Sequence, residues 1–251
     1  MKGVKTPKVY FIGAGPGDPE LITVKAVRIM RKCRTVITAG SLVSPEILKY
    51  SHKEARIYNS AAMALPEIIE TINDACKRGD DTARLHTGDP SLYGAIFEQM
   101  AELNKLSVPY EIIPGVTSLF AAAAALKCEL TAPELSQTVI ITRYAGRTPV
   151  PEDFTALAKA GGTLCIYLSL AMLNEITEEV IKAGRSPDTP AAVVYRASWQ
   201  DEKVISGVVS TIAEMAAGLK NHGLIIIGDV AGGSPATFSR LYDPAFSHGY
   251  R

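Results

Sequence analysis

Short apolar runs rich in β-branched residues alternate with helix-length segments along most of this chain. The clearest helix is expected at residues 65–77. One face of it is shared by Ile68, Ile69, Ile72, Ala75 and Cys76, and Gly79 ends it. Other expected elements of the first half are a helix at residues 20–33 and strands at residues 9–12, 35–38, 82–85 and 110–113. Because consecutive parallel strands need helical crossovers, this alternation predicts an α/β fold with a parallel or mostly parallel sheet.

The alternation pauses at residues 128–137, where Thr131-Ala-Pro-Glu134 has the character of a linker, and then resumes. The second set of expected elements comprises strands at residues 139–142, 164–168, 191–195, 202–205 and 224–227, and helices at residues 170–183 and 211–219. Thr211 and Glu214 have the spacing of a capping box. We therefore expect two α/β domains, residues 1–134 and 135–232, followed by a loose tail at residues 233–251.

Charge, apolar runs and cysteine spacing exclude several classes of protein. Lysine plus arginine equals aspartate plus glutamate at 26 each, so no basic surface for nucleic acid is indicated. Residues 1–8 are polar and residues 116–126 are too short for a membrane span, so we expect no signal peptide, no membrane partner and a cytoplasmic location. The 4 cysteines are solitary and are expected to be reduced thiols.

The first glycine loop, Gly13-Ala-Gly-Pro-Gly-Asp-Pro19, joins a predicted strand to a predicted helix. That context is typical of dinucleotide-binding proteins, in which a pyrophosphate meets the helix N-terminus. Here, however, Asp18 replaces the third glycine of the fingerprint, and two prolines remove amide donors. No Gly-Lys-Ser/Thr follows, so the loop is not a Walker loop. The loop is expected to need close backbone approach without meeting a phosphate; a tight structural turn is the simpler alternative.

Two more glycine loops follow strands of the same predicted sheet. The second is His86-Thr-Gly-Asp-Pro-Ser-Leu-Tyr-Gly94, and the third is Ile113-Pro-Gly-Val-Thr-Ser118. We expect all three at the carboxyl edge of the sheet, where ligands of open α/β sheets bind. Structural alternatives are an Asx turn at Asp89, a satisfied buried side chain at His86, and a cap for the helix after the third loop. No second histidine or cysteine has metal-ligand spacing, so no metal site is expected.

Together these loops resemble the tetrapyrrole (corrin/porphyrin) methyltransferases. The resemblance rests on the first loop, on Thr87-Gly-Asp-Pro90 with Tyr93-Gly94, and on Pro114-Gly-Val-Thr-Ser118, and it covers nearly the whole chain. It implies two α/β domains with a donor-binding trough between them. It also implies S-adenosylmethionine as methyl donor, S-adenosylhomocysteine as product, a tetrapyrrole substrate, and a homodimer.

Further segments are similar to family members that methylate C11 of a corrin precursor, precorrin-4 or cobalt-precorrin-4, in cobalamin biosynthesis. They are Ala39-Gly-Ser-Leu-Val-Ser44, His86-Thr-Gly-Asp-Pro90, Phe120-Ala-Ala-Ala-Ala-Ala125, Glu129-Leu-Thr131, Gln137-Thr-Val-Ile140, Gly146-Arg-Thr-Pro-Val-Pro-Glu152, and Trp199 with Asp201-Glu-Lys203. Two segments depart from that pattern: Ser60-Ala-Ala-Met63 lacks a glycine before the methionine, and Ala197-Ser-Trp-Gln200 replaces Ala-Thr-Trp-Pro. Neither lies in a glycine loop, so they bear on the position methylated and not on the donor.

The resemblance implies site residues as well. The implied donor contacts are Pro16, Thr87, Gly88, Asp89, Leu92, Thr117, Ser118, Leu168 and Ala197. A polycarboxylate substrate should meet arginines, so the expected substrate contacts are Arg143, Arg147 and Arg196, together with Asp18 and Tyr93. Solvated surface cations are the alternative for the arginines. No catalytic residue is assigned, because in-line methyl transfer depends mainly on positioning.

Several other functions stay open at this point. Another tetrapyrrole methylase would act at C2/C7, C17 or C20. A ribosomal RNA 2′-O-methyltransferase or a diphthamide-precursor methylase would share the fold, although the zero net charge counts against RNA. A nucleotide-binding regulatory module would bind NAD or ATP without turnover. Hydrolase functions lack a nucleophile, because the chain has neither a Gly-x-Ser-x-Gly elbow nor a Cys–His pairing.

Overall fold

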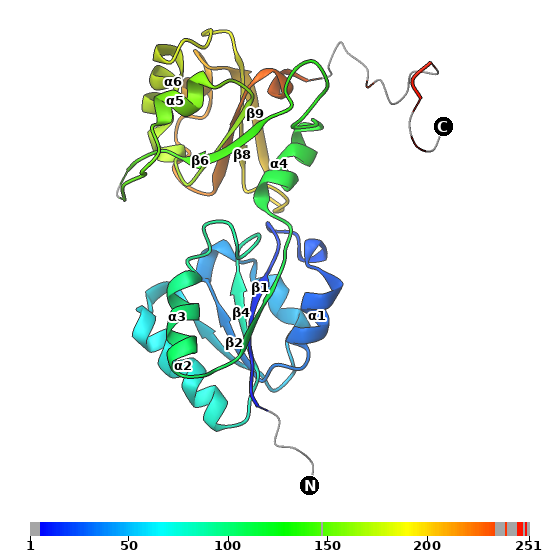
Figure 1. The fold of residues 1–251 in the computed structure, drawn as a ribbon, viewed down its shortest axis with the longest axis vertical. Coiled ribbons are helices and arrows are strands. Elements are labelled where there is room, and N and C mark those ends of the chain that lie inside the picture. The colour runs from blue at the N-terminus through cyan, green and yellow to red at the C-terminus, as the bar shows by residue number, and fades with distance from the viewer. Residues whose placement is uncertain (1–5, 147, 234–238, 240–244, 248, 250–251) are drawn as a thin grey trace. The chain divides into compact units, whose positions relative to one another are not determined.

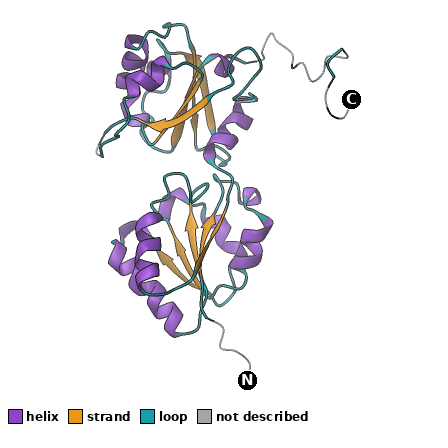
Figure 2. Ribbon diagram, viewed as in Figure 1, coloured by secondary structure: helices purple, strands orange, loops and turns teal. Residues whose placement is uncertain are grey.

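The structure, a computed structural model, describes residues 6–146, 148–233, 239, 245–247 and 249. The chain divides into two compact units: Met1–Ala121 with Ser198–Gln200, and Ala122–Ala197 with Asp201–Arg251. Each unit has a central sheet flanked by helices (Figure 1, Figure 2). Most of the expected tail lies outside the described residues.

This grouping differs from the division that the linker-like segment predicts after residue 134. The segment between the first unit and the second sheet is hydrogen-bonded to that sheet. Thr163 Oγ1 donates to the carbonyl of Leu130 at 2.8 Å, and the backbone N–H of Thr163 donates to Ser136 Oγ at 3.1 Å. Residues 122–136 therefore belong with the second unit, although their sequence has the composition of a connection.

The sheet of the first unit is parallel throughout, in the order β3-β2-β4-β1-β5. Its strands are β1 (Val9–Gly13), β2 (Thr35–Thr38), β3 (Arg56–Asn59), β4 (Thr82–His86) and β5 (Tyr110–Ile113). Its helices are α1 (Val24–Met30), α2 (Leu65–Lys77) and α3 (Phe97–Lys105), and α4 (Ser118–Leu126) continues into the second unit. The parallel sheet confirms the prediction from the alternation. Edge strand β3 was not predicted, because it is largely exposed and lacks an apolar run.

The helix expected at residues 20–33 is wrong in its length. Pro19–Leu21 form a separate 3₁₀ turn, and α1 begins only at Val24. The hydroxyl of Thr23 accepts a hydrogen bond from the backbone N–H of Ala26 at 3.2 Å, which is the arrangement of a helix N-cap. The N-cap therefore places the helix start four residues later than the apolar spacing indicates.

The helices of the first unit cover opposite faces of the sheet, α1 on one and α2 with α3 on the other (Figure 1). Side chains alternate accordingly: Ile12 and Leu85 pack with α1, and Phe11 and Ile37 pack toward α2 and α3. Strands β1 and β4 are neighbours, yet the chain leaves β1 for α1 and leaves β4 for α3. The carboxyl ends of β1 and β4 are therefore a topological switch point, the usual ligand position in such sheets.

The sheet of the second unit is mixed, in the order β6-β7-β10-β8-β9. Only β6 and β7 run parallel, and the remaining pairs are antiparallel. The strands are β6 (Val139–Arg143), β7 (Thr163–Tyr167), β8 (Pro190–Tyr195), β9 (Lys203–Val208) and β10 (Gly223–Ile227). The helices are α5 (Phe154–Lys159), α6 (Leu173–Lys182) and α7 (Ile212–Met215). All five expected strands are present within a few residues.

The capping box expected at Thr211 and Glu214 is wrong. The hydroxyl of Thr211 pairs with the backbone of Val208 and makes no cap hydrogen bond to α7. Helix α7 ends at Met215, so it is also shorter than the expected helix at residues 211–219. The hydroxyl of Thr211 is bonded to the backbone before the helix and does not cap α7, although Thr211 and Glu214 have the spacing of a capping box.

The cysteines are all free thiols. Cys33 and Cys165 are buried, and burial raises the pKa of the Cys165 thiol to about 12. These two thiols therefore pack as small apolar groups, as their isolated positions predict. Within the described residues, no helix is both long and apolar enough to cross a membrane.

Candidate functional site

The first and second glycine loops are hydrogen-bonded to each other beyond the ends of β1 and β4. The N–H of Gly15 donates to the carbonyl of Gly88 at 3.3 Å, and the N–H of Gly88 donates back to Gly15 at 2.9 Å. The N–H of Ala14 donates to the carbonyl of His86 at 2.8 Å. The pairing of the two strands thus continues into the loops at the switch point.

Gly13, Gly88 and Gly115 come into backbone contact, one from each loop, and we call this contact the glycine junction. A Cβ atom on Gly13 would lie 2.5 Å from Cα of Gly115, and one on Gly115 would lie 2.1 Å from the carbonyl oxygen of Gly88. Gly88 has a φ of +63°, a conformation that L side chains rarely adopt. Packing between the loops requires glycine at positions 13 and 115, and the left-handed backbone favours it at position 88, whether or not a ligand approaches them.

Asp89 ties the second loop to the third. Its Oδ1 accepts a hydrogen bond from the N–H of Ser91 at 2.8 Å, which is the Asx turn that the sequence offers as an alternative. Its Oδ2 accepts from the N–H of Gly115, also at 2.8 Å. The carboxylate therefore organises two loops, and its contact with a donor stays a prediction.

Three backbone amides of the first loop donate inside the protein. Those of Ala14 and Gly15 donate to the second loop, and that of Asp18 donates to Ser198 Oγ at 3.0 Å. The two prolines of the loop have no N–H. A phosphate site at a helix N-terminus presents several amides to the anion. With three amides committed inside the protein and two prolines, this loop offers few donors to an anion, which supports the prediction that it does not meet a phosphate.

The expected donor contacts of the first unit all lie in the three loops or directly after them. Pro16 is buried in the first loop, Leu92 is half-buried in the second, and Thr117 and Ser118 are half-buried where α4 begins. The hydroxyl of Thr87 donates to the carbonyl of Leu42 at 2.9 Å. The sheet therefore gathers residues that are far apart in the sequence at one edge, as the strand order predicts.

Asp18 and Tyr93, the expected substrate contacts of this unit, have different surroundings. The carboxylate of Asp18 accepts from the N–H of Glu20 at 2.8 Å and caps the 3₁₀ turn. Tyr93 is 42% exposed and has a φ of +55°, and Ala95 has a φ of +48°. Left-handed backbone is uncommon outside glycine, and such strain gathers at ligand sites.

The remaining candidates follow strands of the second unit. Leu168 comes directly after β7, with a φ of +55° and a side chain 66% exposed. Arg196 follows β8, also has a positive φ, and forms an ion pair with Asp201 at 2.9 Å. Ala197 is buried. An exposed leucine held in a strained conformation at a strand end is a plausible ligand contact by the same reasoning.

Arg143 is bound to its own loop. Its guanidinium donates to Thr148 Oγ1 at 2.7 Å, to the carbonyl of Thr148 at 3.3 Å and to the carbonyl of Pro149 at 2.6 Å. Arg147 lies outside the described residues. Arg143 therefore anchors residues 148–149, next to the position where the sequence predicts a second substrate-binding arginine.

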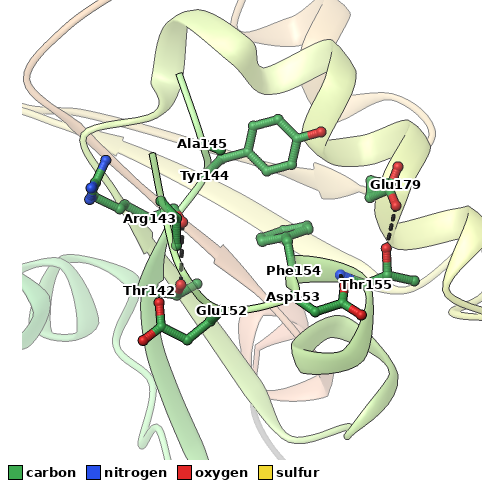
Figure 3. Close-up of a pocket in the computed structure, with 10 residues that line it drawn as sticks. Thr142, Arg143, Tyr144, Ala145, Glu152, Asp153, Phe154, Thr155 and Glu179 are labelled. Carbon is green, nitrogen blue, oxygen red and sulfur yellow. Dashed lines mark hydrogen bonds between the residues drawn. The ribbon is translucent and has the colours of Figure 1, made fainter. Parts of the chain in front are cut away.

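A pocket of about 270 Å³ lies beside Arg143 in the second unit (Figure 3). The rings of Tyr144 and Phe154 meet edge to face in it, with centroids 4.8 Å apart. The hydroxyl of Thr155 donates to the carboxylate of Glu179. The pocket is lined by Thr142, Arg143, Tyr144, Ala145, Val150, Glu152, Asp153, Phe154, Thr155 and Glu179. Its acidic residues outnumber its one arginine, which does not suit a polycarboxylate.

The sequence does not predict the buried cation Arg84, which lies next to the second loop. Arg84 is 5% exposed and donates to Gln99 Oε1 at 3.1 Å, and burial lowers its pKa to about 10. His86 is also buried, against the ring of Phe11, and burial together with the charge of Arg84 lowers its pKa to about 3. His86 is therefore neutral at pH 7, and its buried Nε2 has no hydrogen-bond partner among the described residues, so the side chain is not as fully satisfied as the structural alternative expects.

The family model for "Tetrapyrrole (Corrin/Porphyrin) Methylases" matches residues 8–213, which is most of the chain. The chain belongs to the tetrapyrrole methylases.

This methylase is 51% identical over 248 residues to a cobalt-precorrin-4 C(11)-methyltransferase of Methanocaldococcus jannaschii, a match that covers 97% of the chain and 96% of the relative. It is 47% identical over 247 residues to a precorrin-4 C(11)-methyltransferase of Pseudomonas aeruginosa, covering 97% and 98%. These matches confirm the family resemblance drawn from the loops.

Solved structures of related methylases share the fold. The X-ray structure of a cobalt precorrin-4 methyltransferase, a cobalamin biosynthetic enzyme, matches with a TM-score of 0.87 and 45% identity over 91% of this chain and 96% of that one. A uroporphyrin-III C-methyltransferase from Thermus thermophilus, complexed with S-adenosyl homocysteine, matches with a TM-score of 0.76 and 29% identity over 89% and 92%. The expected α/β fold class is thereby confirmed.

The glycine junction predicts that Gly13→Ala destabilises the ligand-free protein. The new methyl group would overlap the backbone of Gly115, so the free energy of unfolding in urea should fall by about 1–3 kcal/mol. Gly146→Ala is the matched control, because there a Cβ atom would meet only the mobile end of Met172, at 3.0 Å. Equal effects of the two substitutions would contradict the junction.

Burial of His86 predicts a pH-dependent stability. The folded pKa of about 3 lies below the unfolded value of about 6.5, so only the unfolded chain gains a proton between these values. This contribution to stability is complete above pH 6.5 and is lost as pH falls, by up to about 1.4 kcal/mol per unit. His86→Gln should flatten the dependence of the unfolding free energy on pH from 6.5 to 5. His52→Gln is the control, and an unchanged slope in the His86 variant would refute the assignment.

Proposed function

We propose that this methylase transfers a methyl group from S-adenosylmethionine to C11 of a corrin precursor, precorrin-4 or cobalt-precorrin-4, in cobalamin biosynthesis. The observation that carries the proposal is near-complete coverage at 51% and 47% identity to relatives named for that reaction. Five further relatives of 41–45% identity carry one of the same two names. One is named for cobalt-precorrin-4, and four are named for precorrin-4. The position C11 is therefore better supported than the presence of cobalt in the substrate.

The residues at the switch point fit S-adenosylmethionine. This donor has no phosphate, and three amides of the first loop are already committed to His86, Gly88 and Ser198. When bound, it supplies a methyl group on a sulfonium sulfur and leaves as S-adenosylhomocysteine. An adenine and a sulfonium need apolar contact and acceptor oxygens, which buried Pro16 and half-buried Leu92 with the neighbouring carbonyls offer.

We propose that the chain acts by binding and orienting the two reactants, since in-line displacement gains most from position. The proposed donor contacts are Pro16, Thr87, Gly88, Asp89, Leu92, Thr117, Ser118, Leu168 and Ala197. The proposed substrate contacts are Asp18, Tyr93, Arg143, Arg147 and Arg196. A homodimer in the cytoplasm completes the proposal, and light scattering of the purified protein measures the subunit number.

Donor binding should stabilise the protein. S-adenosylhomocysteine at one hundred times its dissociation constant should add about 2.7 kcal/mol to the free energy of unfolding and raise the melting temperature. NAD and ATP should leave the melting temperature unchanged, because the first loop offers few amides for their phosphates. Stabilisation by NAD or ATP alone would reject the donor and favour a nucleotide-binding module.

The position of methylation is tested by product analysis. Incubation with labelled S-adenosylmethionine and precorrin-4 or cobalt-precorrin-4 should give a product whose new methyl group is assigned to C11 by NMR. A methyl group at C2/C7, C17 or C20 would identify another tetrapyrrole methylase. Label in ribosomal RNA and none in the macrocycle would favour the RNA 2′-O-methyltransferase.

Arg147 tests the proposed substrate contacts. If it pairs with a carboxylate of the macrocycle, Arg147→Ala should weaken substrate binding by about 1.5–3 kcal/mol and leave the affinity for S-adenosylhomocysteine unchanged. Lysine should restore only part of the loss, because it lacks the planar fork of arginine. Wild-type substrate affinity in the alanine variant would make this arginine a surface charge.

A further inference from the structure

We propose that Trp199 and Ser198 are positioning residues that hold the first glycine loop in its donor-binding shape. The inference rests on the proposed function, because it concerns the loop assigned to the donor. The chain contributes Ser198–Gln200 to the first unit, although the residues on either side belong to the second. A three-residue segment about 180 positions away in the sequence thus belongs to the same unit as the glycine loop.

Two hydrogen bonds join this segment to the loop. The indole Nε1 of Trp199 donates to the carbonyl of Pro16 at 2.8 Å. The hydroxyl of Ser198 accepts from the backbone N–H of Asp18 at 3.0 Å. The bonds hold the peptide groups on both sides of Gly17, so the direction of each depends on residues outside the loop.

The indole ring also packs on Gly17. A Cβ atom there would lie 2.2 Å from Cδ1 and 2.4 Å from Nε1 of Trp199, so only glycine admits the ring. Gly17 has no left-handed backbone that would demand glycine for another reason. The sequence suggests that the glycines of this loop allow a ligand to approach, but at Gly17 the indole occupies the place of a side chain.

The backbone at and just before this segment has left-handed conformations, which the surrounding contacts must hold in place. Ser198 has a φ of +67°, and Arg196, two residues earlier, has a φ of +49°. Non-glycine residues keep left-handed conformations only where the surrounding structure holds them. The strained turn aims the serine hydroxyl and the indole at the loop, and Pro16, the acceptor of the indole N–H, is itself a proposed donor contact.

The position of Trp199 makes it a reporter. The chain contains 1 tryptophan, so its tryptophan emission, excited selectively over that of the tyrosines, comes from the ring that packs on Gly17. Titration with S-adenosylhomocysteine should change this emission, with a midpoint equal to the dissociation constant from calorimetry. If calorimetry detects binding and the emission stays constant, the coupling between the ring and the donor loop is refuted.

Two single variants test the hydrogen bonds. Trp199→Phe keeps an aromatic ring over Gly17 and removes the N–H, and Ser198→Ala removes the acceptor for Asp18. Each should weaken S-adenosylhomocysteine binding by about 3- to 10-fold, as expected for one net hydrogen bond. Each should raise the KM for the donor and leave kcat at saturating donor unchanged. Thr71→Ala is the control, because that exposed hydroxyl donates to the carbonyl of Glu67 on α2, away from the loops.

A double-mutant cycle tests the packing. Gly17→Ala should weaken donor binding strongly in the wild type but little in a Trp199→Ala background, where the indole is gone. Equal losses in both backgrounds would show that Gly17 faces the ligand itself and would overturn the inference, as would wild-type affinity in both Trp199→Phe and Ser198→Ala. If either Trp199→Phe or Ser198→Ala fails to fold, the donor affinity of the remaining variant decides. Absence of S-adenosylhomocysteine binding by the wild type would instead reject the proposed function.

Discussion

Backbone contact between Gly13, Gly88 and Gly115 is the constraint on which the proposed donor site depends. Gly13 is the last residue of β1, and Gly88 and Gly115 lie in the loops that follow β4 and β5. With no side chain at these positions, the loops pack directly on one another, and Asp89 adds a carboxylate bridge to Gly115. At the switch point between β1 and β4, the loops are therefore joined by their own contacts and hydrogen bonds, without any ligand.

The same constraint selects the kind of ligand. Hydrogen bonds within the protein use three of the amides that a phosphate would need, and the two prolines of the first loop remove others. What remains is a surface of small side chains, carbonyl oxygens and hydroxyls. Such a surface suits a phosphate-free ligand that carries a sulfonium and an adenine better than a dinucleotide. A loop with the outline of a dinucleotide fingerprint can thus serve a different ligand, because three of its amides donate within the protein.

The sequence predicted the buried elements well, because strands such as β1 and β10 are short apolar runs in a regular alternation. It failed where local pattern and tertiary contact differ. Strand β3 is exposed, and α7 stops early because Thr211 bonds to Val208. The mixed order of the second sheet also depends on pairings that no local pattern encodes.

The glycine loops of the candidate site could be predicted from the sequence. The residues outside the loops that contact or neighbour them could not. Gly13, Asp89 and Thr117 stand in motifs that point to one sheet edge. Trp199 and Arg84 do not, because their roles arise from contacts between segments distant in the sequence. The best available signal for Trp199 was its being the only tryptophan in the chain, in a segment shared with the family.

Amide hydrogen exchange measured by NMR on the ligand-free protein tests this account most directly. If the loops are built by their own hydrogen bonds, the amides of Ala14, Gly15, Gly88 and Gly115 exchange slowly without any ligand. Addition of NAD or ATP should leave those rates unchanged. Fast exchange at these four amides in the free protein, with protection appearing only when a nucleotide is added, would contradict the account and identify the loop as a phosphate site.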